Sequence, residues 1–385
     1  MFTTFNREFA PLGFDPRYAL VVLALFLVAM FPINRRYNPM LEKRGGSSIS
    51  MGDLFAFFAI IGISNIAWFW NGLPLDFEQF VNILILNGNN LLAVCVFSLY
   101  RNALSKTALC KSILFAGIVL VASMVWVNGG NTIPPVLMAE DFRQFNSGVE
   151  FLNLFGQPIR VSGFAEDANY ACVMCLMAFG VAFATKSTRR TVKWALALCF
   201  ALGFGLSFSR TMLIGLLITL VVYALYCLYR NVWNIVSLLV VCAFPIVALL
   251  VLPNAHLFGD MATMTNRYWM WDSAEGLFAQ NPIFGSGTSS SRSWMLLVYG
   301  KYVQCHSTWW QIASEQGIIG IVVFTMVCVK RLKVSRSALT IFIIMQFLIY
   351  SINFETAFLQ LLPFSLCLCP LVFDGYGSDP SKERL

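Results

Sequence analysis

The chain has 385 residues, of which 58% are hydrophobic, 15% aromatic and only 12% charged, with a net charge of +7 and a mean hydropathy of +0.72. Soluble domains carry about a quarter charged residues, so this composition excludes a soluble globular protein. It predicts a single integral membrane domain over residues 1–385, built as an all-α, polytopic transmembrane helix bundle.

Eleven apolar runs are long enough to form membrane spans, because a bilayer core of about 30 Å requires roughly 20 apolar residues per helix. The first run is followed by Asn-Arg-Arg-Tyr-Asn-Pro and not by a small-residue cleavage site, so we expect a mature helix and not a signal peptide. In chain order the predicted spans are Tyr18–Asn34, Asp53–Trp70, Phe80–Tyr100, Thr107–Val127, Asn169–Thr185, Val192–Ser209, Thr211–Leu228, Trp233–Leu252, Thr308–Val329, Ala338–Asn353 and Ala357–Phe373.

Lysine and arginine are concentrated in alternate loops, including four residues after the first span, four in 186–193 and four in 330–336. By the positive-inside rule these loops are cytoplasmic and the N-terminal arm is outside. The net charge therefore reflects topology, and no nucleic-acid partner is expected. Two long loops, 129–168 and 253–307, fall on the extracytoplasmic face, and long loops of this kind usually carry function.

Several kinds of site are not supported by the residue content. The chain has no Walker-type lysine loop and no Cys/His spacing for zinc, and a metal-binding pair at Glu166-Asp167 or Glu140-Asp141 is the less favoured alternative. Most of the 11 cysteines fall within spans, so we expect no disulfide. We interpret His256, at the exit of the eighth span, as a loop residue, and we expect neither a metal nor a cofactor.

Arg210 stands alone between two apolar runs. A single helix over both runs would extend roughly 55 Å, almost twice the hydrocarbon core, so the chain must turn at Gly-Leu-Ser-Phe-Ser-Arg-Thr. That turn places Arg210 at the outer membrane surface, on the side where the positive-inside rule disfavours it. Snorkelling to lipid headgroups is one interpretation, and an anion site facing the bundle interior is the favoured one. Arg160, before the helix predicted near Asn169, is interpreted more simply as an ordinary loop arginine.

A segment from Arg267 to Asn281-Pro282 shows an amphipathic pattern, with tryptophans at 269 and 271. An interfacial helix with an aromatic belt explains it, and a second phosphate-binding arginine at Arg267 is the sharper alternative. The segment ends before Gly285-Ser286-Gly287, which we expect to be flexible.

His306 is one of only two histidines and immediately precedes the ninth span. Histidine titrates near neutral pH, which suits a general base, although a lone histidine is more often structural. Glu315, nine positions later, would project to the opposite face of a continuous helix at about 100° per residue. We therefore do not expect Glu315 to orient His306, and a partner from another loop is required.

Arginines and one base on a single outer face suit a lipid-linked pyrophosphate, because the planar guanidinium matches phosphate oxygens. The polyprenyl tail would lie against the apolar bundle, the diphosphate would meet the arginines, and the sugar would project into the outer loops.

Four motifs together resemble the bacterial O-antigen polymerase and O-antigen ligase superfamily. They are Arg-x-Ser-Gly-Phe with Asn-Tyr (160–170), Ser-x-Ser-Arg-Thr (207–211), Arg-x-x-x-Trp with a later Pro-x-x-Gly-x-Gly (267–287), and His-Ser with Glu-x-Gly-Ile-Ile-Gly (306–320). The resemblance covers the chain from about Arg160 to Val323. Two departures are visible: the family often has His-Asn where this chain has His306-Ser307, and twelve spans are common among the ligases.

The resemblance implies a metal-independent, inverting glycosyl transfer at the outer face of the bacterial inner membrane, without a cofactor. The donor would be an undecaprenyl-pyrophosphate-linked oligosaccharide and the acceptor a glycan or a lipid, with membrane lipids and a chain-length regulator as further partners. Position by position, Arg210 and Arg267 would bind the pyrophosphate, Arg160 would assist, and His306 would deprotonate the acceptor hydroxyl.

The sequence is compatible with three functions. A polysaccharide polymerase is favoured, because the Ser-Gly-Phe and Asn-Tyr pattern of the first outer loop looks closer to that branch. A ligase that transfers the glycan to the lipid A core would use the same centre. An exporter or permease of an anionic lipid-linked glycan would also place arginines inside a helical bundle, but it would need no base at His306.

Overall fold

A computed structural model describes residues 106–129, 161–165, 168–184, 189–207, 210–251, 253–254, 265–301, 303, 305–334 and 338–353, with short pieces at 25–27, 29–30 and 96. The predicted spans Asp53–Trp70 and Ala357–Phe373 lie outside the described residues, as do most of Tyr18–Asn34 and nearly all of Phe80–Tyr100. Most of the predicted outer loop 129–168 also lies outside them. The predicted total of eleven spans therefore stays a prediction.

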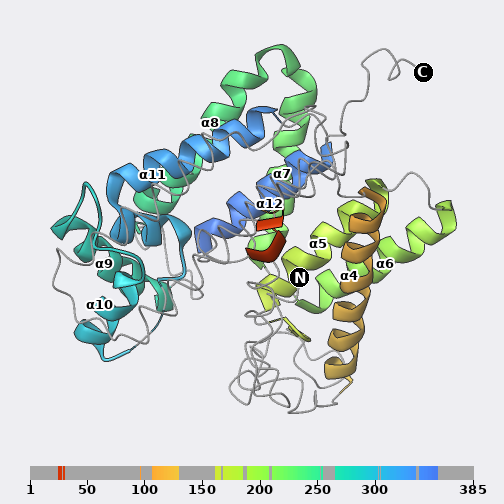
Figure 1. Cartoon of the computed structure of the whole chain (residues 1–385), viewed down its shortest axis with the longest axis horizontal. Coiled ribbons are helices and arrows are strands. Elements are labelled where there is room, and N and C mark those ends of the chain that lie inside the picture. The colour runs from red at the N-terminus through yellow and green to blue at the C-terminus, as the bar shows by residue number, and fades with distance from the viewer. Residues whose placement is uncertain are drawn as a thin grey trace.

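The described residues form helices joined by turns (Figure 1), which confirms the all-α prediction for this part of the chain. The helices are α4 (Lys106–Asn128), α5 (Ala168–Ala184), α6 (Arg190–Ser207), α7 (Arg210–Leu228), the short 3₁₀ helix η5 (Arg230–Val232), α8 (Trp233–Ile246) with its π-helical continuation η6 (Val247–Val251), α9 (Thr265–Gln280), α10 (Ser290–Tyr299), α11 (Thr308–Val334) and α12 (Ala338–Asn353).

The described helices have the length and surface of a membrane bundle. Ala108–Asn128 and Trp233–Val251 are long and apolar enough to cross a bilayer. Large apolar side chains point outward from the helices: Phe115 is 70% exposed, Leu198 69% and Leu239 66%. Surfaces this apolar are rare on soluble monomers, whereas lipid tails would cover them. The polytopic membrane architecture predicted from composition is consistent with both features.

The turn predicted around Arg210 is confirmed. Helix α6 ends at Ser207 and α7 begins at Arg210, so the two apolar runs form two helices and not one. Ser207 is buried and its hydroxyl donates to the Phe204 carbonyl at 2.7 Å.

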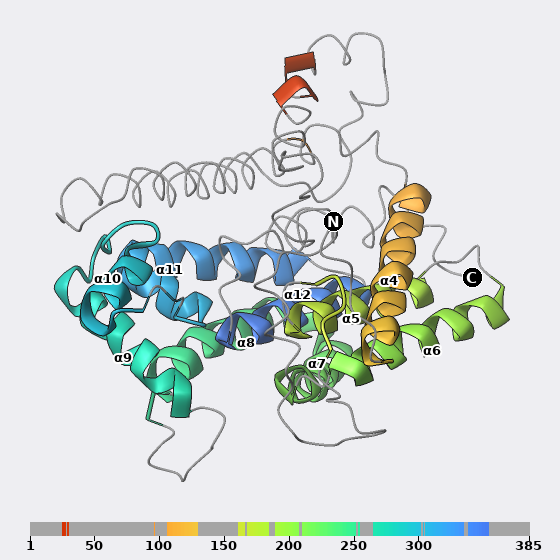
Figure 2. The same cartoon turned by 90° about the horizontal axis from the view of Figure 1, so that it is seen from below.

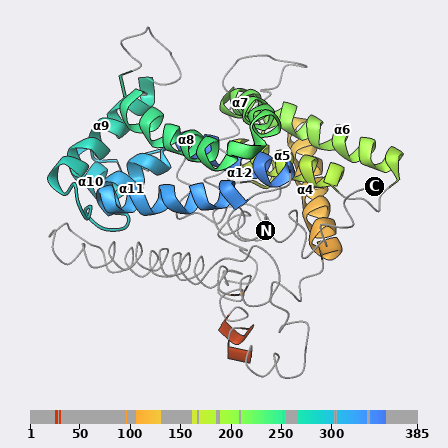
Figure 3. The ribbon, with the colours of Figure 1, turned by 90° about the horizontal axis from the view of Figure 1, so that it is seen from above.

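Helices α4, α5 and α6 pack against one another at one end of the molecule (Figure 3). Small residues allow close approach there, as is usual for helix pairs in membranes. A Cβ at Gly117 would collide with the Phe200 ring, and one at Gly203 would collide with the side chains of Cys175 and Val121.

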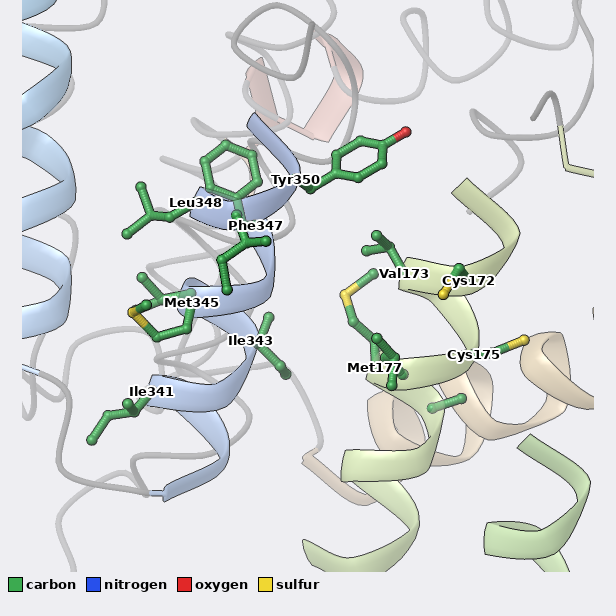
Figure 4. Packing of buried hydrophobic residues seen from close by; sticks show 14 of the residues in the cluster. Cys172, Val173, Cys175, Met177, Ile341, Ile343, Met345, Phe347, Leu348 and Tyr350 are labelled. Atoms are coloured by element: carbon green, nitrogen blue, oxygen red, sulfur yellow. The ribbon is translucent and has the colours of Figure 1, made fainter. Parts of the chain in front are cut away.

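Helix α12 connects this group to the rest of the bundle. Its Ile343 and Tyr350 side chains project toward α5 (Figure 4), and the rings of Tyr170 and Tyr350 lie 5.5 Å apart. Helix α12 also makes a polar contact with α7, in which Gln346 Nε2 donates to Thr219 Oγ1 at 2.9 Å. Helices α8 and α11 are joined similarly, since Trp233 Nε1 donates to the Leu332 carbonyl at 3.2 Å.

The segment predicted as the long outer loop 253–307 contains two helices. The segment predicted to be an amphipathic helix forms α9, which ends at Gln280 directly before Asn281-Pro282, as predicted. Helix α10 was not predicted. Both helices pack around the first part of α11, at the end of the molecule opposite α4 and α6 (Figure 2).

Candidate functional site

Helix α11 is broken at Gly317. This residue has φ 66° and ψ −165°, a backbone region that essentially only glycine occupies. The ring centroids of Trp309 and Phe324 are 5.2 Å apart, although 15 residues of straight helix would separate them by about 22 Å at 1.5 Å per residue. The prediction of one continuous span over Thr308–Val329 was therefore wrong: residues 308–316 form a first segment that folds back on a second segment, 318–334.

The loop between α9 and α10 fills this break. Because Gly317 is not helical, the N–H groups of Ile318 and Ile319 lose their partners within the helix, and they donate instead to the carbonyls of Pro282 (2.8 Å) and Ile283 (3.4 Å). The carbonyls of Ser314 and Glu315 in turn accept from the N–H groups of 286 and 287, both at 2.9 Å. The backbone groups that the break releases are thus paired with the loop, as buried polar groups require.

Gly285-Ser286-Gly287 was predicted to be flexible, and that prediction was wrong. All three residues are buried, and a Cβ on Gly285 would overlap the backbone of Glu315. Asn281 fixes the loop from the other side, because its Nδ2 donates to Ser286 Oγ at 3.0 Å. The glycines are needed for close approach of two backbones, and not for mobility.

His306 lies at the start of the first segment of α11. Its backbone has φ 51°, a left-handed conformation uncommon for residues other than glycine, and its side chain is half-buried. Ser307 caps the segment. Its carbonyl accepts a hydrogen bond from the Gln311 N–H at 2.9 Å, and its hydroxyl accepts one from the Trp310 N–H at 3.5 Å. Serine and asparagine are both good N-cap residues, so His-Ser here provides the cap that His-Asn would provide.

Arg267 is half-buried on the first turn of α9. One turn later, Trp271 enters a small hydrophobic cluster, the α9–α11 cluster, which holds Trp271, Ala274, Met295, Cys305, Trp310 and Ala313. Cys305, the residue before His306, is fully buried in this cluster and its thiol donates to the Ser307 carbonyl at 3.2 Å. The elements that carry Arg267 and His306 therefore share one packed core.

Arg210 is the first residue of α7, and this helix packs against α12 and α8. The turn from α6 to α7 is also close to the segment that carries the Ser-Gly-Phe motif. The N–H of Val161 donates to the Leu206 carbonyl at 2.9 Å, and that of Phe164 donates to Ser123 Oγ at 3.0 Å. Arg160 itself lies outside the described residues, as do the acidic pairs at 140–141 and 166–167 and His256.

Glu315, which was not predicted to belong to the site, lies in a buried polar contact between α10 and α11. Its side chain is fully buried. One carboxylate oxygen accepts from Ser291 Oγ on α10 at 2.7 Å, and the other accepts from Gln311 Nε2 at 3.5 Å. Ser290 and Ser293, on the same helix α10, are also buried. The signal available in the sequence was the one acidic residue of 308–334, which stands two positions before a glycine.

Among the described residues, no group of three or more His, Cys, Asp and Glu side chains is arranged to hold a metal ion. The eight described cysteines form no disulfide.

A family model described as O-antigen ligase matches residues 194–325. The family comprises membrane glycosyltransferases of the ligase and polymerase type, and the resemblance predicted from the motifs is confirmed over that range. The match runs from α6 into the second segment of α11, so it includes Arg210, Arg267 and His306 and leaves out Arg160. No curated protein and no solved structure matches the chain.

Proposed function

We propose, from the match to the O-antigen ligase family model over residues 194–325, that the chain is a metal-independent, inverting glycosyltransferase acting on an undecaprenyl-pyrophosphate-linked glycan. It works at the outer face of the bacterial inner membrane and polymerises a polysaccharide. The observation that carries the proposal is the family match, which includes three of the four candidate residues chosen from the sequence.

In the proposed reaction, His306 accepts the proton of the acceptor hydroxyl while that oxygen attacks the anomeric carbon of the donor sugar. The bond from that carbon to the diphosphate breaks, and the undecaprenyl pyrophosphate leaves with the bonding electrons. A single displacement of this kind inverts the anomeric configuration. Arg210 and Arg267 bind the diphosphate and stabilise the charge that grows on it, a role for which arginine's planar fork is suited, and Arg160 assists.

The packing around His306 supports this role. The left-handed backbone at His306 and the cap at Ser307 hold the residue at a defined place, next to the buried α9–α11 cluster. Catalytic groups need this kind of fixed support, because small errors of position are costly to the rate.

The test is a reconstituted reaction of the purified protein with a synthetic polyprenyl-pyrophosphate oligosaccharide, analysed for longer glycans. We expect His306→Ala to lower the rate by about 10²- to 10⁴-fold, the usual contribution of a general base. Arg210→Lys should also lose most activity, because it keeps the charge but loses the bidentate fork. Arg189→Lys, an exposed position before α6, is the matched control and should retain activity.

Full activity of His306→Ala would remove the histidine from the mechanism. Glycan transfer only to a lipid A core acceptor would make the protein a ligase. Transport of the lipid-linked glycan across a vesicle membrane without any bond formation would identify an exporter.

A further inference from the structure

The buried carboxylate of Glu315 is not explained by its place in a membrane helix. Burial of a carboxylate is costly unless hydrogen bonds compensate it, and acidic side chains inside membrane helices usually have a function. Glu315 is fully buried and joins α11 to α10, through the 2.7 Å bond from Ser291 and the weaker contact from Gln311.

The same residue also holds the loop that follows α9. Its backbone carbonyl accepts a hydrogen bond from the Gly287 N–H, and the carbonyl of Ser314 accepts one from the Ser286 N–H. Glu315 therefore contacts α10 through its side chain and the α9–α10 loop through its backbone, on the segment of α11 that begins two residues after His306.

From these contacts we infer that Glu315 is a positioning residue, which sets the placement of His306 relative to Arg267. The carboxylate fixes the first segment of α11 against α10, and the loop bonds fix the same segment against the end of α9. Through the α9–α11 cluster these contacts determine how the helix that carries Arg267 meets the residues that flank His306. This inference rests on the proposed function, in which His306 deprotonates the acceptor and Arg267 binds the diphosphate of the donor in the same reaction.

Two substitutions test the role of the carboxylate. Glu315→Gln keeps the size of the side chain but removes one acceptor oxygen, and Ser291→Ala removes the donor on α10 with a smaller risk to folding. We expect each to lower kcat by about 10- to 100-fold, the effect of misplacing a reacting group by about 1 Å, with the KM for the lipid-linked donor little changed. Because both substitutions remove the same contact, the kcat of the double variant should be no lower than that of the more impaired single variant. Glu275→Gln, the same change on an exposed carboxylate of α9, is the matched control.

A second readout does not depend on activity. Cys305 is fully buried in the α9–α11 cluster, and Cys172 is fully buried in the main bundle core. We expect Glu315→Gln and Ser291→Ala to speed the alkylation of Cys305 by N-ethylmaleimide, while Cys172 stays protected. Peptide mass spectrometry measures the alkylation of each cysteine over time. Faster alkylation of both cysteines would mean general unfolding and would overturn the inference, as would wild-type kcat together with wild-type alkylation in both variants.

Failure of the proposed function can be distinguished from failure of the positioning role of Glu315. If the wild-type protein makes no glycan product, the proposed function fails, and the Cys305 alkylation rate alone decides the structural part of the inference. If the wild type is active and His306→Ala is not, but both Glu315→Gln and Ser291→Ala are fully active, the function stands and the positioning role is wrong.

Discussion

Gly317 is the residue on which the geometry of the site depends most directly. Its φ of 66° permits the fold-back of α11, and a Cβ there would overlap the carbonyl group of Ile283 and the N–H of Gly285. We expect Gly317→Ala to destabilise the protein by about 1–3 kcal/mol from backbone strain alone, with additional loss from the displaced loop. Thermal unfolding of the purified protein in detergent measures this as a lower Tm.

Gly276→Ala is the control for this substitution. Gly276 lies inside α9, and a Cβ there meets nothing within 4 Å, so alanine should raise stability by about 0.5–1 kcal/mol through its better helix propensity. Equal Tm values for Gly317→Ala and the wild type would show that the break in α11 does not require glycine.

At the scale of single residues, the sequence could identify part of the site. Charged and titratable residues are rare in so apolar a chain, and therefore Arg210, Arg267 and His306 could be singled out by type and place. The role of Glu315 could not be predicted, because it depends on a break at Gly317 that the apolar pattern on either side does not reveal. The hydrophobic run continues past the glycine, and the pattern alone is equally compatible with one straight helix.

At the scale of helices, the contact between α7 and α12 is a polar bond inside an apolar interface. Gln346 donates to Thr219 Oγ1, which itself donates to the Gly215 carbonyl at 2.7 Å. Such bonds between membrane helices contribute about 0.6 kcal/mol on average and up to about 1.7 kcal/mol. We expect Thr219→Val to lower the free energy of unfolding by an amount in this range, measured by titration with sodium dodecyl sulfate in mixed micelles.

Ser112 on α4 provides the comparison. Its exposed hydroxyl donates only within its own helix, to the Ala108 carbonyl at 3.0 Å, so Ser112→Ala should leave the unfolding free energy nearly unchanged. Together with the single variants Thr219→Val and Gln346→Leu, the double variant Gln346→Leu/Thr219→Val isolates the coupling between the two helices. A coupling of zero would mean that apolar packing alone sets the place of α7, the helix that begins with Arg210.

Helix boundaries were predictable where physical limits act on the chain. The turn between α6 and α7 follows from the thickness of the bilayer, and the end of α9 follows from Asn281-Pro282, since proline disfavours helix in the residue before it. Helix α10 was missed because its first turns consist mainly of serine, which is a weak helix former. Its formation depends on tertiary contacts, among them the bond from Ser291 to Glu315.

At the scale of the whole molecule, the outward faces of the helices decide whether the bundle is surrounded by lipid. Leu198 lies at the middle of α6 and is 69% exposed, whereas Phe200 on the same helix is fully buried. In water an exposed Leu198→Asp change would be tolerated. At the centre of a membrane helix an aspartate costs about 3 kcal/mol, so we expect Leu198→Asp to impair insertion and to lower the amount of protein retained in membranes after alkaline extraction.

Ala279→Asp, at an exposed position near the end of α9, places the same charge in the segment predicted to lie outside the membrane. We expect it to leave the retained amount unchanged, because a charge at the water boundary keeps its hydration. Equal retention of Leu198→Asp and the wild type would mean that this face of α6 meets water or another protein chain. An equal loss in both variants would place α9 within the hydrocarbon region, which would contradict the outer-face position of Arg267 on which the proposed recognition of the diphosphate depends.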